Sequence, residues 1–323
     1  MKRHVWLAIL LAIGWVGAAH AATVGFETLS VPVSGDRPLQ VAVWYPSAAP
    51  EAPEPLGLGE QTVARDAPIA GRNHPLIVIS HGTGGSKSDH FDTAQALARA
   101  GFVVAAVSHT GDTYDDRSRA LRISERPGHL VRLIDYMTGT WRGRGALDPR
   151  RIGAFGFSSG GFTVLAAIGG EPNLALVAPH CREHPDYFDC RLGKSTGAIA
   201  PTVPPPVAHD ARIRAAVIAA PALGFSFAPS GLSRVTIPVQ LWRAGEDTVL
   251  PHPLYAEAVR GALPRPPEYH VVPGADHFDF LPPCNATLAK AAAAICGHGT
   301  FDRAAFHAAF NAEIVRFFRK TLG

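Results

Sequence analysis

Residues 151–168 decide the fold, and they read RIGAFGFSSGGFTVLAAI. The apolar run that ends at Phe157 is typical of a buried strand, and the apolar residues after Gly161 are typical of a helix. Between them, residues 156–160 form the pattern G-x-S-x-G. Small residues beside a serine let a strand and a helix pack closely around a strained turn. The stretch therefore predicts a strand, a tight turn and a helix, with Ser158 presented as a nucleophile.

Apolar runs before and after this stretch alternate with helical segments. Strands are predicted at 76–79, 102–107, 152–157, 213–219, 238–242 and 269–272, and helices at 91–100, near 129–137 and at 301–320. A strand that is apolar at every position is buried on both faces, which is typical of a parallel sheet covered by helices. The sequence therefore predicts the α/β class, with a mostly parallel central sheet and helices on both of its faces.

Three segments flank or interrupt this alternation. Residues 26–33 and 39–45 are rich in β-formers around a short turn composition, which predicts an antiparallel hairpin. Residues 46–74 contain much Pro, Ala, Gly and Glu without a sustained period, and we expect a long surface excursion there. Residues 171–209 contain Pro, His and two cysteines, and we expect a cap-like insertion between strands. The length and apolar content favour one domain over residues 22–323.

The N-terminus has the features of a secretory signal. Lys2 and Arg3 precede an apolar run at residues 5–18, and Ala19-His20-Ala21 supplies the small residues of a cleavage site. The alternative is an uncleaved membrane anchor, but the run is short for a spanning helix. We expect residues 1–21 to be removed, so that the product is secreted or periplasmic without a stable membrane anchor.

The charge balance argues against polyanionic partners. The chain has a formal net charge of +3, and removal of residues 1–21 takes away two basic residues and no acidic one, which leaves +1. A protein so close to neutral has no electrostatic basis for binding nucleic acid or an anionic membrane. We therefore expect neither as a partner.

An even number of cysteines in an exported chain predicts disulfides. Three connectivities exist for Cys181, Cys190, Cys284 and Cys296, and we favour the two local pairs, Cys181–Cys190 and Cys284–Cys296. The alternative is a metal site that also uses nearby histidines, His180, His184 and His298. Its ligands would come from two distant segments without the C-x-x-C spacing of zinc sites, so we expect no metal.

A serine nucleophile needs a histidine base and a carboxylate that orients it, which follow Ser158 in the order acid, then base, in this kind of fold. Glu246 and Asp247 lie just after the strand predicted at 238–242. His277 follows the strand predicted at 269–272, and this position in the expected order favours a general base over an idle loop histidine. Its neighbours Asp276 and Asp279 are expected to be capping or solvated residues.

Negative charge on a carbonyl oxygen needs preorganised N–H donors. The Gly-rich segment 80–86, Ser-His-Gly-Thr-Gly-Gly-Ser, follows the strand predicted at 76–79. We assign one donor to the backbone of Thr83 and the other to that of Ser159, the residue after the nucleophile. Such a loop could also cradle phosphate, but it lacks the spacing of nucleotide-binding motifs. His81 is interpreted as a brace for the loop.

These motifs together resemble the α/β-hydrolase superfamily. The resemblance rests on His-Gly-Thr-Gly-Gly, Gly-Phe-Ser-Ser-Gly, Gly-Glu-Asp and Asp-His, together with Val41 to Pro46, and it covers nearly all of residues 22–323. Within it, the chain resembles exported bacterial proteins described as predicted dienelactone hydrolases and serine esterases related to platelet-activating-factor acetylhydrolases. The resemblance implies that Asp247, not Glu246, is the acid. Dienelactone hydrolases have a cysteine where this chain has Ser158.

The resulting hypothesis is a cofactor-free serine hydrolase that cleaves small-molecule carboxylic esters through an acyl-enzyme. Ser158, Asp247 and His277 would form its catalytic triad. Five phenylalanines near predicted strand ends are candidates for an acyl pocket: Phe157, Phe225, Phe227, Phe278 and Phe280. A periplasmic peptidase or amidase with the same triad is the alternative, and a non-catalytic binding protein on the same scaffold is the third hypothesis.

Overall fold

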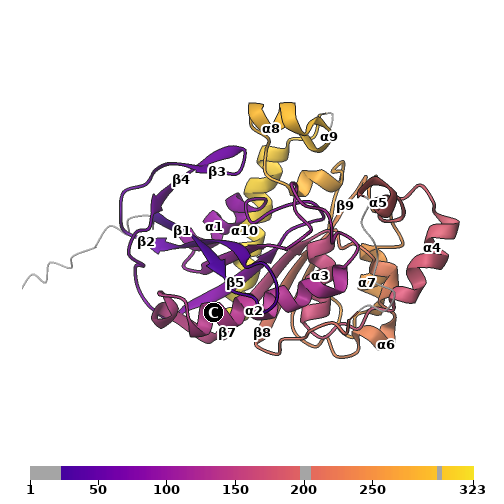
Figure 1. Cartoon of the computed structure of the whole chain (residues 1–323), viewed down its shortest axis with the longest axis horizontal. Coiled ribbons are helices and arrows are strands. Elements are labelled where there is room, and N and C mark those ends of the chain that lie inside the picture. The colour runs from indigo at the N-terminus through magenta and orange to yellow at the C-terminus, as the bar shows by residue number, and fades with distance from the viewer. Residues whose placement is uncertain (1–22, 197–204, 297–299) are drawn as a thin grey trace, which may run out of the picture.

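A ten-stranded sheet forms the centre of the computed structural model, which describes residues 23–196, 205–296 and 300–323 (Figure 1). The predicted signal segment, residues 1–21, lies outside the described residues. The strands are β1 (Thr23–Val31), β2 (Leu39–Ser47), β3 (Ala52–Leu56), β4 (Gly59–Arg65), β5 (His74–Ser80), β6 (Val103–Ser108), β7 (Leu147–Phe157), β8 (Ile213–Ala219), β9 (Val239–Ala244) and β10 (Glu268–Val272).

The sheet runs in the order β10-β9-β8-β7-β5-β6-β2-β1-β4-β3. Neighbouring strands from β10 to β6 are all parallel, and β2 joins β6 antiparallel. The predicted hairpin is confirmed, because β1 and β2 pair antiparallel from Thr23 opposite Ser47 to Val31 opposite Leu39. The parallel half brings the carboxyl ends of β5, β7, β9 and β10 to one edge, where open α/β sheets bind ligands.

The expectation of a surface excursion at residues 46–74 is wrong. Strands β3 and β4 form an antiparallel hairpin within it, and β4 also pairs with β1, so the sheet extends beyond the N-terminal hairpin. Val63 and Ala64 are buried there, whereas Pro53 and Pro55 occupy the outermost strand. Proline is tolerated on an edge strand because its missing N–H faces away from the ladder. The proline-rich composition therefore concealed a real strand.

Helices cover both faces of the sheet, as predicted. They are α1 (Phe91–Arg99), α2 (Arg126–Gly139), α3 (Ser159–Ala167), α4 (Val177–Glu183), α5 (Phe188–Thr196), α6 (Pro229–Leu232), α7 (Ala256–Ala262), α8 (Ala286–Ala291), α9 (Ala293–Cys296) and α10 (Arg303–Leu322). Two separate apolar clusters lie against the sheet, one containing side chains of α2, α3 and α7 and the other containing those of α1 and α10. The described helices include none with the length and apolar character required to cross a membrane.

The segment predicted as a cap lies between α3 and β8. Its described part contains the short helix η3 (Leu174–Leu176) followed by α4 and α5, which the Cys181–Cys190 disulfide joins. The second disulfide, Cys284–Cys296, closes the segment with α8 and α9 that projects from the body in Figure 1. Both local cysteine pairs predicted from the sequence are therefore present.

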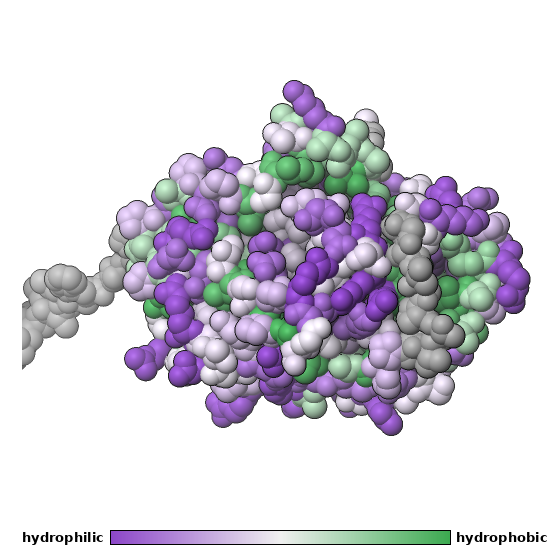
Figure 2. Space-filling view, viewed as in Figure 1, coloured by the Kyte–Doolittle hydropathy of each residue, from purple (hydrophilic) through white to green (hydrophobic). Residues whose placement is uncertain are grey.

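Figure 2 shows apolar residues gathered at and below α8 and α9, with hydrophilic and neutral residues intermingled over much of the remaining face. Four large apolar side chains are exposed in the described parts of the chain, and they belong to four different segments: Leu58, Tyr114, Leu176 and Val271. Isolated apolar side chains of this kind are normal on soluble proteins.

Candidate active site

Ser158 occupies a strained turn between β7 and α3. Its φ of 56° and ψ of −119° lie in a region that non-glycine residues rarely adopt. A Cβ at Gly156 would lie 2.1 Å from the Gly160 carbonyl oxygen, and one at Gly160 would lie 1.9 Å from that of Ser80. Both glycines are therefore required by backbone contacts, and these contacts hold the turn that presents Ser158.

The structure brings Ser158, His277 and Asp247 together from the ends of three strands. The Nε2 atom of His277 lies 3.0 Å from Ser158 Oγ, and its Nδ1 atom lies 2.9 Å from Asp247 Oδ2. Since a carboxylate only accepts, Nδ1–H donates to Asp247 and Nε2 is left to accept the serine proton. His277 is 1% exposed, Ser158 6% and Asp247 8%, so the three groups interact in a site largely shielded from water.

The loops that carry acid and base are tied to each other. Asp247 Oδ1 accepts the N–H groups of Val249 and Leu250 at 3.1 and 2.7 Å, which leaves Oδ2 for His277. Asp276 accepts the backbone N–H of Thr248 at 2.7 Å. Asp276 and Asp279 also form the capping box of η5 (His277–Phe280), as expected for capping residues. The neighbouring candidate, Glu246, is exposed, and the structure therefore places Asp247 as the carboxylate at the histidine.

Thr83 and Ser159, the two predicted donor residues, lie side by side. Their hydroxyl oxygens are 2.5 Å apart, although they are separated by 76 residues. Ser159 is the first residue of α3, where backbone N–H groups have no acceptor within the helix and the helix dipole favours negative charge. The two residues that the sequence predicts as donors therefore lie beside each other, at the start of α3 and in the segment of residues 81–86, which is called the oxyanion loop below.

Two buried histidines, His81 at the start of the oxyanion loop and His109 after β6, are hydrogen-bonded to each other. His81 donates from Nδ1 to the Gly82 carbonyl at 2.6 Å and accepts the His109 N–H on Nε2 at 3.0 Å. Burial and the Arg126 charge hold the pKa values of His81 and His109 well below the usual range, so both rings are neutral. The predicted role of His81 as a brace agrees with these bonds to the backbone.

The five phenylalanines proposed for an acyl pocket divide into two groups. Phe227 and Phe280 are buried in the two apolar clusters, and Phe157 is 2% exposed with its ring 4.8 Å from that of His277. Phe225 and Phe278 are only half-buried. Phe157 therefore supports the histidine, while Phe225 and Phe278 are the members of the set with accessible surface.

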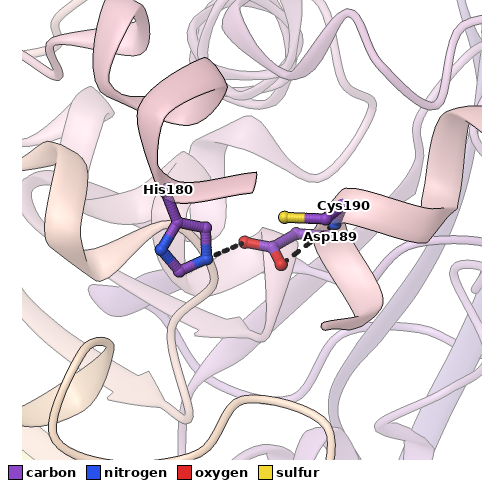
Figure 3. Close-up of side chains that lie close together, drawn as sticks. All are labelled: His180, Asp189 and Cys190. Atoms are coloured by element: carbon purple, nitrogen blue, oxygen red, sulfur yellow. Dashed lines mark hydrogen bonds and ion pairs between the residues drawn. The ribbon is translucent and has the colours of Figure 1, made fainter. Parts of the chain in front are cut away.

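The predicted cap meets the core through a polar cluster of His180, Asp189 and Tyr255. His180 Nε2 lies 3.1 Å from the Tyr255 hydroxyl, which donates to Asp189 at 3.1 Å. His180 also stacks on Phe225 with ring centres 3.8 Å apart. Figure 3 shows His180 and Asp189 facing each other beside Cys190.

This cluster bears on the alternative of a metal site. His180, Asp189 and Cys190 have ligand atoms within 4.8 Å of one another, but the Cys190 sulfur is bonded to Cys181 and cannot act as a thiolate ligand. His184 stacks on Tyr187, and His298 lies outside the described residues. The contacts of this cluster are those of a hydrogen-bonded junction between cap and core.

Sequence analysis missed the side chains that support the site from a distance. Arg126, Asp112 and Tyr255 have no motif around them, and each meets partners that lie far away in the chain. The only sequence signal for Arg126 and Asp112 was their charge, because a charged side chain that becomes buried almost always has a partner. That signal could not identify the partner.

The parallel sheet, with a serine at the strained turn after β7, has an α/β-hydrolase-like fold. Residues 89–178 match the model of the prolyl oligopeptidase family. The chain is 30% identical over 125 residues to a bis(hydroxyethyl) terephthalate hydrolase of Streptomyces coelicolor. A ferulic acid esterase from Streptomyces cinnamoneus has a similar solved structure, with a TM-score of 0.64 and 22% identity over 95% of this chain and 92% of that one.

These similarities differ in extent. The match to the terephthalate hydrolase covers 38% of this chain and 37% of the relative. The likeness to the ferulic acid esterase covers nearly the whole chain, and at its level of identity it concerns the fold. Both proteins bear the names of enzymes that act on esters.

Proposed function

We propose that this protein is a serine hydrolase that cleaves carboxylic esters through an acyl-enzyme. The observation that carries the proposal is the hydrogen-bonded series from Ser158 Oγ through His277 to Asp247, with distances of 3.0 and 2.9 Å. The two ester-hydrolysing relatives support the same reaction.

In the proposed mechanism, Ser158 Oγ attacks the acyl carbon while its proton passes to His277 Nε2. The tetrahedral intermediate collapses, the bond to the alcohol breaks, and His277 returns the proton to the leaving oxygen. Water then attacks the acyl-enzyme with His277 again as the base, which releases the acid and restores Ser158. Asp247 keeps the ring in the required tautomer and stabilises the imidazolium in both steps.

The proposed oxyanion hole consists of the backbone N–H groups of Thr83 and Ser159. Each donor of this kind contributes roughly 3 to 4 kcal/mol of transition-state stabilisation. The hydrogen bond between the two side-chain hydroxyls supports the pairing of these residues across the site. No cofactor takes part in the proposed reaction.

Esters of aromatic acids are the proposed substrate class. The names of both relatives refer to aromatic acids, terephthalic and ferulic. Half-buried Phe225 and Phe278 offer aromatic surface near His277 and the cap. A comparison of methyl ferulate with methyl butanoate, which release the same alcohol, tests this class, and a preference for the straight-chain aliphatic ester would contradict it.

A peptidase or amidase is the second candidate. It is favoured by the match of residues 89–178 to the prolyl oligopeptidase family model. The proposed triad would serve either reaction, since ester and amide hydrolysis share the tetrahedral intermediate. Peptide anilides tested beside the esters separate the two, and faster cleavage of the anilides would favour the peptidase.

We also retain export as a proposal. Two disulfides suit an oxidising compartment, where they form and persist. Cleavage after Ala21 is tested by N-terminal sequencing of the protein recovered from the periplasm or medium of an expressing bacterium. Retention of residues 1–21 would contradict it.

The principal experiment compares ester turnover by the wild type and by Ser158→Ala. Triad removal is expected to lower kcat for 4-nitrophenyl acetate by about 10⁶-fold, with binding and the oxyanion hole providing the residual rate. Asp210→Asn, a change at a buried carboxylate near the opposite end of β8, is the control for nonspecific effects. Equal rates for the wild type and Ser158→Ala would contradict the mechanism.

A further inference from the structure

A buried ion pair holds the oxyanion loop from behind. Arg126 Nη1 lies 3.1 Å from Asp112 Oδ2, and each side chain is only 3% exposed. Arg126 begins α2, and Asp112 belongs to the loop after β6. Neither residue belongs to the proposed triad or supplies an oxyanion donor.

Both members of the pair also bond to the backbone of the loop. Asp112 Oδ1 accepts the N–H of Gly84 at 2.9 Å, and the second terminal nitrogen of Arg126 donates to the carbonyl of His81. These two backbone groups lie on either side of Thr83. The direction of the Thr83 N–H depends on the peptide units around it, so the pair fixes the segment that aims this donor.

The turn is glycine-rich, and besides the ion pair it is held by the bond from His81 Nδ1 to the Gly82 carbonyl and by that between the Thr83 and Ser159 hydroxyls. Gly84 has a φ of +67°, and the Gly85 N–H reaches the Gly82 carbonyl at 3.2 Å. Glycine residues lose more conformational freedom on folding than any other residue, so a turn with three of them needs external bonds to be rigid. The ion pair supplies such bonds at both ends.

From this geometry we infer that Arg126 and Asp112 are positioning residues for the oxyanion hole. They act through the His81 carbonyl and the Gly84 N–H to place the Thr83 N–H where charge develops in the transition state. The inference rests on the proposed function, because an oxyanion hole has a purpose only if acyl transfer occurs.

The energetics of burial agree with a positioning role. Burial lowers the pKa of Arg126 to about 10, so the guanidinium keeps its charge at neutral pH, and burial raises the pKa of Asp112. Replacing a buried ion pair by groups of similar shape is often neutral or stabilising, whereas removal of one partner is strongly destabilising. A double replacement therefore separates the positioning role from a contribution to stability.

The test uses Asp112→Leu combined with Arg126→Met, which removes both charges and the acceptor of the Gly84 N–H at similar side-chain volume. Arg126→Lys is the second variant, because it keeps the positive charge but cannot serve both acceptors in the same geometry. Asp210→Asn is the matched control, since Asp210 is also buried, pairs with an arginine and accepts a backbone N–H, that of Arg212 at 2.9 Å. Thermal unfolding is followed for all of them.

The readout is the ratio of kcat for an oxygen ester to kcat for its thionoester, 4-nitrophenyl acetate against O-4-nitrophenyl thioacetate. Sulfur is larger and a weaker acceptor, so a well-placed N–H donor favours the oxygen ester. We expect the double variant to lose about 10²-fold in kcat for the oxygen ester, as when one donor is removed, with little change in KM. The thionoester rate should fall much less, so the ratio contracts, whereas Asp210→Asn retains the wild-type ratio.

Other outcomes overturn the inference. A folded double variant or Arg126→Lys with the wild-type ratio shows that the pair does not position the donor. Equal losses on both esters, with a matching loss of thermal stability, assign the pair a structural role only. The proposed function fails separately, if the wild type shows no turnover that depends on Ser158.

Discussion

The two sides of Ser158 are built differently. On the oxyanion side, buried side chains bond directly to the backbone of residues 81–86. On the cap side, the junction with the core consists of side chains that contact side chains, with His180 and Asp189 around the Tyr255 hydroxyl. Changes on the first side should move N–H donors and lower kcat. Changes on the second should alter the space for the substrate and raise KM.

Among changes outside the proposed triad, the largest effect is expected for Gly160→Ala. A Cβ at this position would lie 1.9 Å from the Ser80 carbonyl oxygen, and backbone at this junction cannot move without displacing the oxyanion loop. We expect kcat for 4-nitrophenyl acetate to fall by about 10³-fold. Steady-state kinetics on the folded variant provide the measurement, and activity near that of the wild type would contradict the proposed backbone junction.

Asp89 offers a prediction for stability on the oxyanion side. Its carboxylate accepts the Ser86 N–H at 3.0 Å, and burial raises its pKa from 3.8 to about 6. A carboxyl whose pKa is raised on folding contributes stability that is full below pH 3.8 and is lost as the pH rises through about 6. As the pH rises through this range, the free energy of unfolding measured with urea should therefore fall by about 3 kcal/mol in the wild type. Asp89→Asn should lack this decrease. Parallel pH profiles for the two proteins would be inconsistent with this titration.

Much of this architecture could be predicted from the sequence because its signals are local. The strained turn at Ser158, the strand ends before Asp247 and His277, the Gly-rich loop and the cysteine pairs each lie in short segments with a recognisable composition. Arg126 could not be predicted as a support, since it lies 14 residues from Asp112 and 45 from His81. The β3–β4 hairpin was missed because two prolines on its edge strand obscured the alternation.

Tyr255→Phe tests the cap side. Burial and the nearby Asp189 carboxylate raise the pKa of Tyr255, so its hydroxyl is protonated and donates to Asp189. Without that donor, Asp189 loses a hydrogen-bond partner, and we expect the free energy of unfolding to fall by about 1 to 3 kcal/mol. We expect a higher KM for aromatic esters and an unchanged kcat for 4-nitrophenyl acetate. If kcat falls on every ester while KM stays constant, the distinction between the two sides fails.

The smallest effect is expected for Gly193→Ala, the cap-side counterpart of Gly160→Ala. Gly193 lies within α5, and a Cβ there would meet only the end of the Leu121 side chain, at 3.1 Å. A flexible side chain can move, and alanine favours a helix over glycine by about 1 kcal/mol. We therefore expect kinetics like those of the wild type and a midpoint of thermal unfolding that is equal or slightly higher. A large loss of activity would show that this part of α5 is more constrained than its contacts indicate.

The central claim is that Ser158 is a nucleophile activated by His277 and Asp247. Its most direct test is labelling with a fluorophosphonate probe, followed by identification of the modified residue by mass spectrometry. We predict one modified residue, Ser158, in the wild type, slower labelling in Asp247→Asn, and no label in Ser158→Ala. A folded wild-type protein that remains unlabelled at Ser158 would contradict the account.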